Sequence, residues 1–229
     1  MDTITQFRGF TQTRVYNILT AIPLVAWFAL LVFMQSRSLV EELLKAHDAG
    51  LNLLSGTSLL AHCATLLLVF LWIPLLLARL RPVAKAPGFH PRLAAWAGSF
   101  LGTGILLLPS HPHAWELNLL ATLLIMGGAV FSIYSIFCLG RSVSIMAEAR
   151  RLVTHGPYAR IRHPLYLGEE IVLLGITLEF ISPWAVALLI CQWAFQMRRM
   201  SYEELVLKGA FPEYETYMAR TARLIPGFY

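Results

Sequence analysis

Charged residues are scarce in this sequence, which excludes an ordinary water-soluble domain. Asp, Glu, Lys and Arg make up 14% of the 229 residues, whereas soluble domains contain about 25%. The hydrophobic fraction of 57% and the mean hydropathy of +0.63 exclude disorder as well, since disorder requires low hydrophobicity and high charge. What the chain has instead is long apolar blocks separated by short charged stretches, a pattern typical of polytopic helical membrane proteins.

Cysteine is also rare, and its placement argues against a metal centre or a disulfide framework. Cys63, Cys138 and Cys191 all fall within apolar blocks, with no CxxC and no Cys/His cluster. They are interpreted as small packing residues. The glycines at 102, 104, 127 and 128 follow no predicted strand, so they indicate close helix packing and not a nucleotide-binding loop.

The sequence lacks a basic run with interleaved aromatic residues of the kind that follows a nucleic-acid backbone. The net charge of +5 lies beside apolar blocks, so it indicates attraction to anionic lipid headgroups, and no nucleic-acid partner is expected. The N-terminal residues also lack the charged start, short apolar core and cleavage site of a signal peptide. The first apolar block is therefore expected to stay in the mature protein.

Five apolar regions approach the roughly 20 residues that a membrane-spanning helix needs. They are 18–35, 53–78, 93–109, 117–139 and 165–197. The last would form a helix of about 50 Å, too long for one crossing. It contains Ser182-Pro183 near its middle, and proline interrupts a helix. The sequence therefore predicts an all-α, polytopic transmembrane bundle of about six spans, the last two forming a tight hairpin.

The distribution of Lys and Arg supports this count. With six spans and both termini in the cytoplasm, all of the 18 Lys and Arg except Arg37 and Lys45 fall on one side. Lys and Arg resist translocation, so the richly basic side is expected to face the cytoplasm.

Polar residues gather in the last third of the chain. One group surrounds Gly156-Pro157, a turn signal, and continues to Glu169 and Glu170, where unpaired carboxylates at the start of a span are costly. The second follows the last span and contains Arg199 and Glu203, which lie four apart on one helix face. Both groups are predicted at the same membrane face.

These groups carry a resemblance to a known family. The segments LVTHGPYARIRHPLYLG and FPEYETYMARTARLIPGFY, with Arg199 and the pair Glu203-Glu204 between them, resemble the C-terminal half of the isoprenylcysteine carboxyl methyltransferases. They are more distantly similar to the phospholipid methyltransferases. The resemblance divides the chain into an N-terminal region of four spans, 1–139, and a methyltransferase-like region, 140–229. This sequence departs from the prenylcysteine enzymes after Gly168, where Glu169 and Glu170 stand in place of a large aromatic residue.

The resemblance implies an integral membrane enzyme that uses S-adenosylmethionine at the cytoplasmic face and methylates a lipophilic or prenylated acceptor, most simply an isoprenylcysteine-type carboxylate. It implies that Arg199 holds the acceptor carboxylate. The cofactor contacts that it implies are Leu152, Val153, Tyr158, His163, Pro164, Leu165, Tyr166 and Glu203.

The nature of the acceptor decides whether a base is needed. A carboxylate is already nucleophilic at neutral pH, whereas an amino-lipid or a small thiol must lose a proton, which makes Glu170, Glu204 or His163 candidate bases. Two other functions remain open. A membrane sterol-type reductase shares a similar C-terminal pattern and uses NADPH, and a transporter would explain the acids Glu169, Glu170 and Glu179 on one apolar helix.

Overall fold

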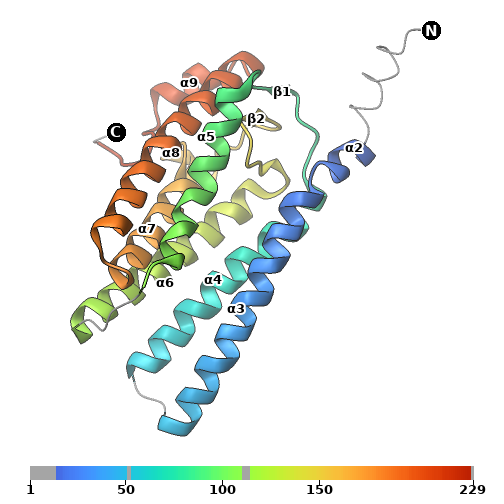
Figure 1. Cartoon of the computed structure of the whole chain (residues 1–229). Helices are drawn as coiled ribbons and strands as arrows, with labels where there is room; N and C mark the ends of the chain where they lie inside the picture. Colours follow the sequence, from blue (N-terminus) through green and yellow to red (C-terminus); the bar gives the residue numbers. More distant parts are fainter. Residues whose placement is uncertain (1–13, 51–52, 110–113, 228–229) are drawn as a thin grey trace.

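A computed structural model describes residues 14–50, 53–109 and 114–227, which form a helical bundle (Figure 1). The α-helices are α2 (Arg14–Leu19), α3 (Ile22–Ala49), α4 (Leu53–Ala78), α5 (Phe89–Phe100), α6 (Trp115–Leu139), α7 (Pro164–Glu179), α8 (Pro183–Ala210) and α9 (Tyr214–Ala219). The 3-10 helices are η1 (Leu101–Leu107), η2 (Gly140–Ser142) and η3 (Gly156–Ala159), and the two short strands are β1 (Ala84–Lys85) and β2 (Glu148–Ala149). The expected all-α class is correct apart from this two-residue strand pair.

Among the described residues, three helical segments are long and apolar enough to cross a membrane by themselves, namely 15–48, 55–78 and 115–142. They include the expected first, second and fourth spans. Helix α3 runs beyond the expected end at Gln35 as far as Ala49, because the charged residues that follow are good helix formers. It ends at Gly50, whose φ of 79° favours glycine.

The third apolar block does not form one continuous α-helix. Helix α5 ends at Phe100 and the chain continues as the 3-10 helix η1, which contains both Gly102 and Gly104. Glycine is a poor α-helix former, and the 3-10 form is the common alternative in short segments. The expected span 93–109 is therefore a composite element.

The predicted break at Ser182-Pro183 is confirmed. Helix α7 ends at Glu179, and α8 begins at Pro183 after a short turn. The Ser182 hydroxyl accepts a hydrogen bond from the Ala185 amide at 3.1 Å, so it caps α8 directly before a proline at the first helical position. Helix α8 then continues past Met197 to Ala210, which places both Arg199 and Glu203 on it.

Helices α6 and α7 pack most closely, while α4 lies between α3 and α6, and α8 packs mainly on α5 (Figure 1). Glycines allow the close approach of α6 and α7. A Cβ atom on Gly128 would lie 2.7 Å from the backbone nitrogen of Val172 and 2.8 Å from the carbonyl oxygen of Gly168. At Gly175 it would lie 2.7 Å from the carbonyl oxygen of Ala121. The packing role expected for Gly128 is confirmed, whereas Gly127 faces open space.

Replacing Gly128 by alanine is therefore expected to destabilise the protein by about 1–3 kcal/mol, because the backbone atoms it would meet belong to a neighbouring helix. The matched control is Gly127→Ala, where the new methyl group meets no atom within 4 Å. This control should leave the stability unchanged or raise it by up to about 1 kcal/mol through helix propensity. Thermal unfolding in detergent measures both variants, and equal effects would contradict the packing role.

Large apolar side chains cover the outside of the bundle. Phe33, Leu60, Phe137 and Trp184 are each at least 60% exposed. Soluble monomers rarely expose such a surface, so these residues fit contact with lipid. Residues 1–13 and 228–229 lie outside the described residues. The expected location of both termini in the cytoplasm therefore stays a prediction.

The two loops after α4 and α6 meet at one end of the bundle. Strands β1 and β2 pair antiparallel, with Ala84 opposite Ala149 and Lys85 opposite Glu148. Further backbone hydrogen bonds extend this contact, including Leu80 N to Arg141 O at 2.7 Å. The pairing joins the N-terminal helices to the loop that builds the site.

Candidate active site

The loop between α6 and α7 folds back on the end of α6 at a turn that requires glycine. Gly156 has a φ of +60°, and a Cβ atom there would lie 2.7 Å from Cys138 Sγ. Pro157 then starts η3, and Pro164 occupies the first helical position of α7. The turn predicted from Gly156-Pro157 is confirmed, and it brings Tyr158 and His163 to the end of the bundle.

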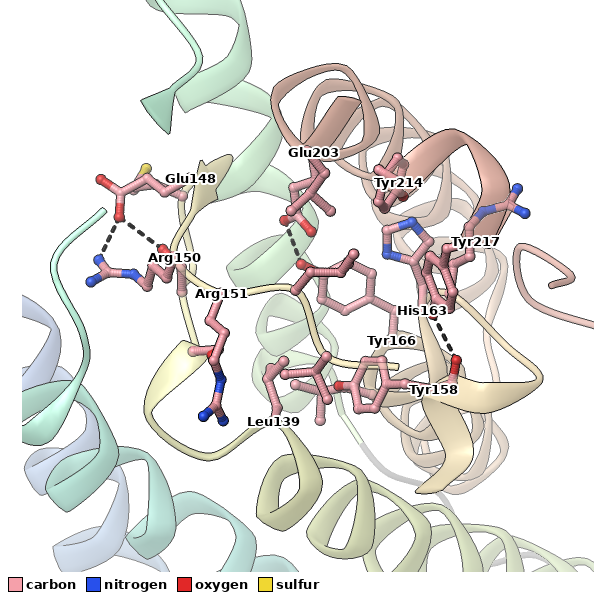
Figure 2. Close-up of a pocket in the computed structure, with 18 residues that line it drawn as sticks. Leu139, Glu148, Arg150, Arg151, Tyr158, His163, Tyr166, Glu203, Tyr214 and Tyr217 are labelled. Carbon is pink, nitrogen blue, oxygen red and sulfur yellow. Dashed lines mark hydrogen bonds and ion pairs between the residues drawn. The ribbon is translucent and has the colours of Figure 1, made fainter. Parts of the chain in front are cut away.

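A cavity lies between this loop, the first turn of α7, the end of α8 and α9 (Figure 2). It has an empty volume of about 710 Å³, part of which is open to solvent. Its wall combines apolar side chains with phenol, carboxylate, imidazole and guanidinium groups. The wall residues that the sequence analysis had proposed as cofactor contacts are Leu152, Val153, Tyr158, His163, Leu165, Tyr166 and Glu203. The eighth, Pro164, is buried behind them at the start of α7.

A chain of polar contacts runs from this cavity into the bundle. The Tyr166 hydroxyl donates a hydrogen bond to Glu203 Oε1, and Arg199 Nε donates to the same oxygen at 3.2 Å. The Arg199 guanidinium also lies 4.4 Å from the centre of the Tyr166 ring, a cation–π distance. Arg199 is only 2% exposed, and its Nη1 donates to Ser99 Oγ on α5 at 2.9 Å. Several partners therefore fix this guanidinium.

Arg199 lines a second cavity. This cavity has an empty volume of about 510 Å³ and is mostly aromatic and aliphatic. Its other wall residues are Trp27, Phe28, Leu31, Trp72, Ser99, Phe100, Thr103, Ile145 and Glu169. The Phe28 and Trp72 rings stack with their centres 5.4 Å apart. Arg199 therefore lies between the apolar cavity, which it lines, and Tyr166 and Glu203, which line the polar one.

The three glutamates of this region have different surroundings. Glu169 is the carboxylate in the apolar cavity, while its neighbour Glu170, a candidate base, accepts a hydrogen bond from Gln192 Nε2 at 3.1 Å. Glu204, the other candidate, is held by Arg162, His163 and Arg223 and is not part of the wall of the first cavity. Glu169 and Glu170 face different neighbours because successive residues on a helix point about 100° apart.

Glu204 fastens the C-terminal segment to the loop before α7. Its Oε1 lies 2.9 Å from Arg162 Nε, 3.2 Å from His163 Nε2 and 3.3 Å from Arg223 Nε. Backbone hydrogen bonds join the same segments, including His163 N to the carbonyl oxygen of Arg223 at 3.1 Å. The Tyr217 hydroxyl donates to the carbonyl oxygen of Tyr158 at 2.7 Å. The C-terminal segment thus completes the wall of the first cavity.

Acid is expected to weaken this attachment. Burial raises the pKa of Glu204, but the hydrogen bond and charge of His163, followed by Arg162 and Arg223, hold the pKa at about 2. A carboxyl group whose pKa is lower in the folded state stabilises that state above its unfolded pKa, and the stabilisation is lost as the pH falls. The folded protein should therefore lose about 3 kcal/mol between pH 4.5 and 2.

The measurement is thermal unfolding in detergent across this pH range. Glu204→Gln should be less stable at neutral pH and should lack this part of the pH dependence. Glu213→Gln is the matched control, since Glu213 is an exposed carboxylate before α9. An identical pH dependence in the Glu204→Gln variant and the parent would contradict the assignment.

Sequence reasoning missed part of both cavities. The first contains Ser142, Glu148 and Arg150 from the loop, and Tyr214 and Tyr217 from α9. The sequence signal for these residues was present, since they lie in the polar stretch after Arg141 and in the C-terminal segment that carries the resemblance. The aromatic wall of the second cavity had no such signal, because Trp or Phe in an apolar helix reads as ordinary packing.

Comparison with known proteins gives a consistent result. The sequence pattern of the family described as phospholipid methyltransferase matches residues 117–214, which include α6, the loop, α7 and α8. A probable protein-S-isoprenylcysteine O-methyltransferase of Oryza sativa subsp. indica is 29% identical over 131 residues, which are 54% of this chain and 69% of the rice protein.

Two further relatives cover similar parts of the chain. Protein-S-isoprenylcysteine O-methyltransferase A of Arabidopsis thaliana is 31% identical over 131 residues, 54% of this chain and 66% of the plant protein. The cobalt-zinc-cadmium resistance protein CzcN of Cupriavidus metallidurans is 30% identical over 116 residues, 49% of this chain and 51% of that protein.

Proposed function

Since this chain belongs to the isoprenylcysteine carboxyl methyltransferase family, we propose that it transfers a methyl group from S-adenosylmethionine to an isoprenylcysteine-type carboxylate. That it is a methyltransferase follows from the family, while the cofactor and the acceptor are the proposal. The observation that carries it is the position of Arg199, which lines the apolar cavity and donates a hydrogen bond to Glu203 in the wall of the polar cavity.

The first cavity suits S-adenosylmethionine by its unsatisfied polar atoms. The Ser142 hydroxyl and the Tyr214 hydroxyl are buried without a hydrogen-bond partner among the described residues. Both belong to the cavity wall, so they are available to a polar ligand. The proposed cofactor contacts are the seven wall residues that the sequence analysis had already suggested. Pro164, the eighth, sets the start of α7.

The cofactor, when bound, supplies an electrophilic methyl group on a sulfonium. The chain's own residues supply orientation and exclude water. The Tyr158 ring offers a face to a cation or to adenine, whereas the Tyr166 ring already has the Arg199 guanidinium over it and the His163 ring stacked on it. Burial raises the pKa of Tyr158 well above its ordinary value, so its phenol stays neutral. Glu203 is held by Tyr166 and Arg199, so its carboxylate is fixed before a ligand binds.

The second cavity suits the lipophilic part of the acceptor. Its aromatic and aliphatic wall would bury an isoprenoid chain, and Arg199 at its polar end would bind the carboxylate through paired hydrogen bonds. A carboxylate requires no general base, so Arg199 acts by positioning the acceptor and not by proton transfer.

One observation favours an amine or thiol acceptor as a second candidate. Glu169 places a carboxylate in the same cavity as Arg199, where it would compete with an acceptor carboxylate and could take a proton from an amino-lipid or a small thiol. Glu169→Gln separates the two cases. Turnover of a carboxylate acceptor should be kept or increased in this variant, whereas turnover of an amine or thiol should fall sharply.

The proposal includes the membrane arrangement. The six spans would be α3, α4, α5 with η1, α6, α7 and α8. Both termini and the first cavity would lie on the cytoplasmic side. The division between residues 139 and 140 would separate the four N-terminal spans from the methyltransferase-like region. The excess of Lys and Arg on one side supports this orientation. A reporter fused after Tyr229 should report the cytoplasm, and an external location would mean an odd number of spans.

Titration calorimetry of the purified full chain tests the cofactor. S-adenosylmethionine and its demethylated product should bind, and NADPH should not. A methyl-transfer assay with a farnesylcysteine derivative, an amino-lipid and a lipophilic thiol then identifies the acceptor class. Binding of NADPH alone would overturn the proposal in favour of a reductase. Absence of binding by a folded protein, together with solute flux in liposomes, would favour a transporter.

A further inference from the structure

A third cavity lies between the start of α3, the end of α4, β1 and α5, and cations dominate its wall. Arg79, Lys85 and Arg92 line it, while Glu148 is the single acid among its wall residues. Its empty volume is about 860 Å³. None of these three cations was assigned a role by the methyl-transfer proposal.

Glu148 does not balance this charge, because its carboxylate is already shared. Oε1 lies 3.0 Å from Lys85 Nζ, and Oε2 accepts hydrogen bonds from Ser144 Oγ at 3.0 Å and from Arg150 Nη2. Within the described residues, neither Arg79 nor Arg92 forms an ion pair with a carboxylate. The wall therefore keeps an excess of positive charge.

Two guanidinium groups near this cavity are buried with unused donors, of which Arg79 belongs to its wall and Arg150 lines the first cavity. Arg79 is 8% exposed, and its Nη2 donates to the carbonyl oxygen of Asn17 at 3.1 Å and to Thr20 Oγ at 3.0 Å. Its Nε, like Nε and Nη1 of Arg150, has no acceptor among the described residues. Figure 2 shows the Arg150 guanidinium directed toward Glu148 and away from Tyr166. A buried donor without an acceptor costs about 1–3 kcal/mol, more when charged.

Burial is the first cause that lowers the pKa of Arg79, and Glu148 opposes it only in part. An anion in the third cavity would lower this cost. Guanidinium groups match the geometry of phosphate oxygens, and an ammonium group beside them adds a further donor. The surroundings fit a membrane interface, because Ile22, Val83 and Trp96 are large apolar residues exposed nearby along the chain.

We propose that Arg79, Lys85 and Arg92 form a binding site for a phosphate group, supplied by an anionic phospholipid headgroup or by free phosphate. The site is separate from the polar cavity proposed for the cofactor, but Met146 and Glu148 belong to the walls of both. Occupancy stabilises the β1–β2 pair, since Lys85 of β1, which pairs with Glu148 of β2, gains a second partner.

The test uses the full chain in a non-ionic detergent, with thermal unfolding followed by tryptophan fluorescence. The probes are phosphatidylglycerol, phosphatidylcholine and inorganic phosphate, with chloride at the same ionic strength as the reference. Arg92→Gln is the test variant, since Arg92 is exposed and its loss should leave the unliganded fold intact. Arg81→Gln is the matched control, because Arg81 is an exposed cation nearby that does not line the cavity.

Phosphatidylglycerol should raise Tm in a saturable way. The lipid concentration at half of the maximal rise should increase about 10-fold in Arg92→Gln but not in Arg81→Gln, and this result would support the lipid headgroup as the source of the phosphate. The same pattern with inorganic phosphate would support free phosphate as the source. Equal weakening in both variants would show a general charge effect and overturn the site. A response of Arg92→Gln identical to that of the parent would also overturn it.

Discussion

Replacing Arg199 by lysine is expected to lower kcat/KM about 100-fold, the size of effect that follows removal of one fixed donor from an active site. The guanidinium serves Glu203, Ser99 and the Tyr166 ring at the same time, and an ammonium group offers no planar fork for these partners. Lysine keeps the buried positive charge beside Glu203. Alanine would leave the Glu203 carboxylate without a charged partner, so a loss of activity in that variant could result from misfolding.

The matched control for this variant is Arg198→Lys, because Arg198 is the exposed neighbour on the same helix. It should retain the parent's rate. The affinity for S-adenosylmethionine, measured by calorimetry, should change less than turnover in Arg199→Lys. If the affinity for S-adenosylmethionine falls as much as turnover does, Arg199 would be assigned to the cofactor site and not to the acceptor site.

Replacing Glu203 by glutamine should weaken the binding of S-adenosylmethionine by at least about 10-fold, because hydrogen bonds to a charged group contribute about 1.5–3 kcal/mol. The carboxylate accepts from both Tyr166 and Arg199, and the amide that replaces it carries no charge for either partner or for the ligand. Calorimetry of the full chain measures this effect directly.

Glu215→Gln provides the control for charge alone, since Glu215 is exposed on α9. The variant Glu203→Asp adds a further readout. It keeps the negative charge but on a shorter side chain. If charge is the main contribution, Glu203→Asp should bind S-adenosylmethionine more tightly than Glu203→Gln does. If the position of the carboxylate oxygens is the main contribution, the two variants should bind it about equally weakly. Parent-like affinity in Glu203→Gln would remove this residue from the cofactor site.

The sequence predicted the fold well where a single strong signal governed it. The proline at 183 directly follows a serine that caps α8, and this local chemistry was sufficient to predict the break between α7 and α8. The helix face shared by Arg199 and Glu203 was predictable for the same reason, since a spacing of four is a property of the helix itself.

Contacts between distant segments were beyond such reasoning. The pairing of β1 with β2 joins residues 84–85 to 148–149, and no local pattern marks either pair as a strand. The aromatic cavity required knowing that Trp27 and Trp72 come near Arg199, which depends on how three helices pack. The different surroundings of Glu169 and Glu170 depend on their positions on α7 relative to α5 and α8, which could not be read from spacing alone.

The attachment of the C-terminal segment has a consequence for the protein's synthesis. Residues 214–224 join the loop before α7 through Glu204, the Tyr217 hydroxyl and the bridge between Ile161 and Ala222. A ribosome adds these residues after helices α3 to α8, so the wall of the first cavity stays open until they have been synthesised. The helices can therefore integrate into the bilayer with this cavity unfinished, and its wall closes only once residues 214–224 have emerged.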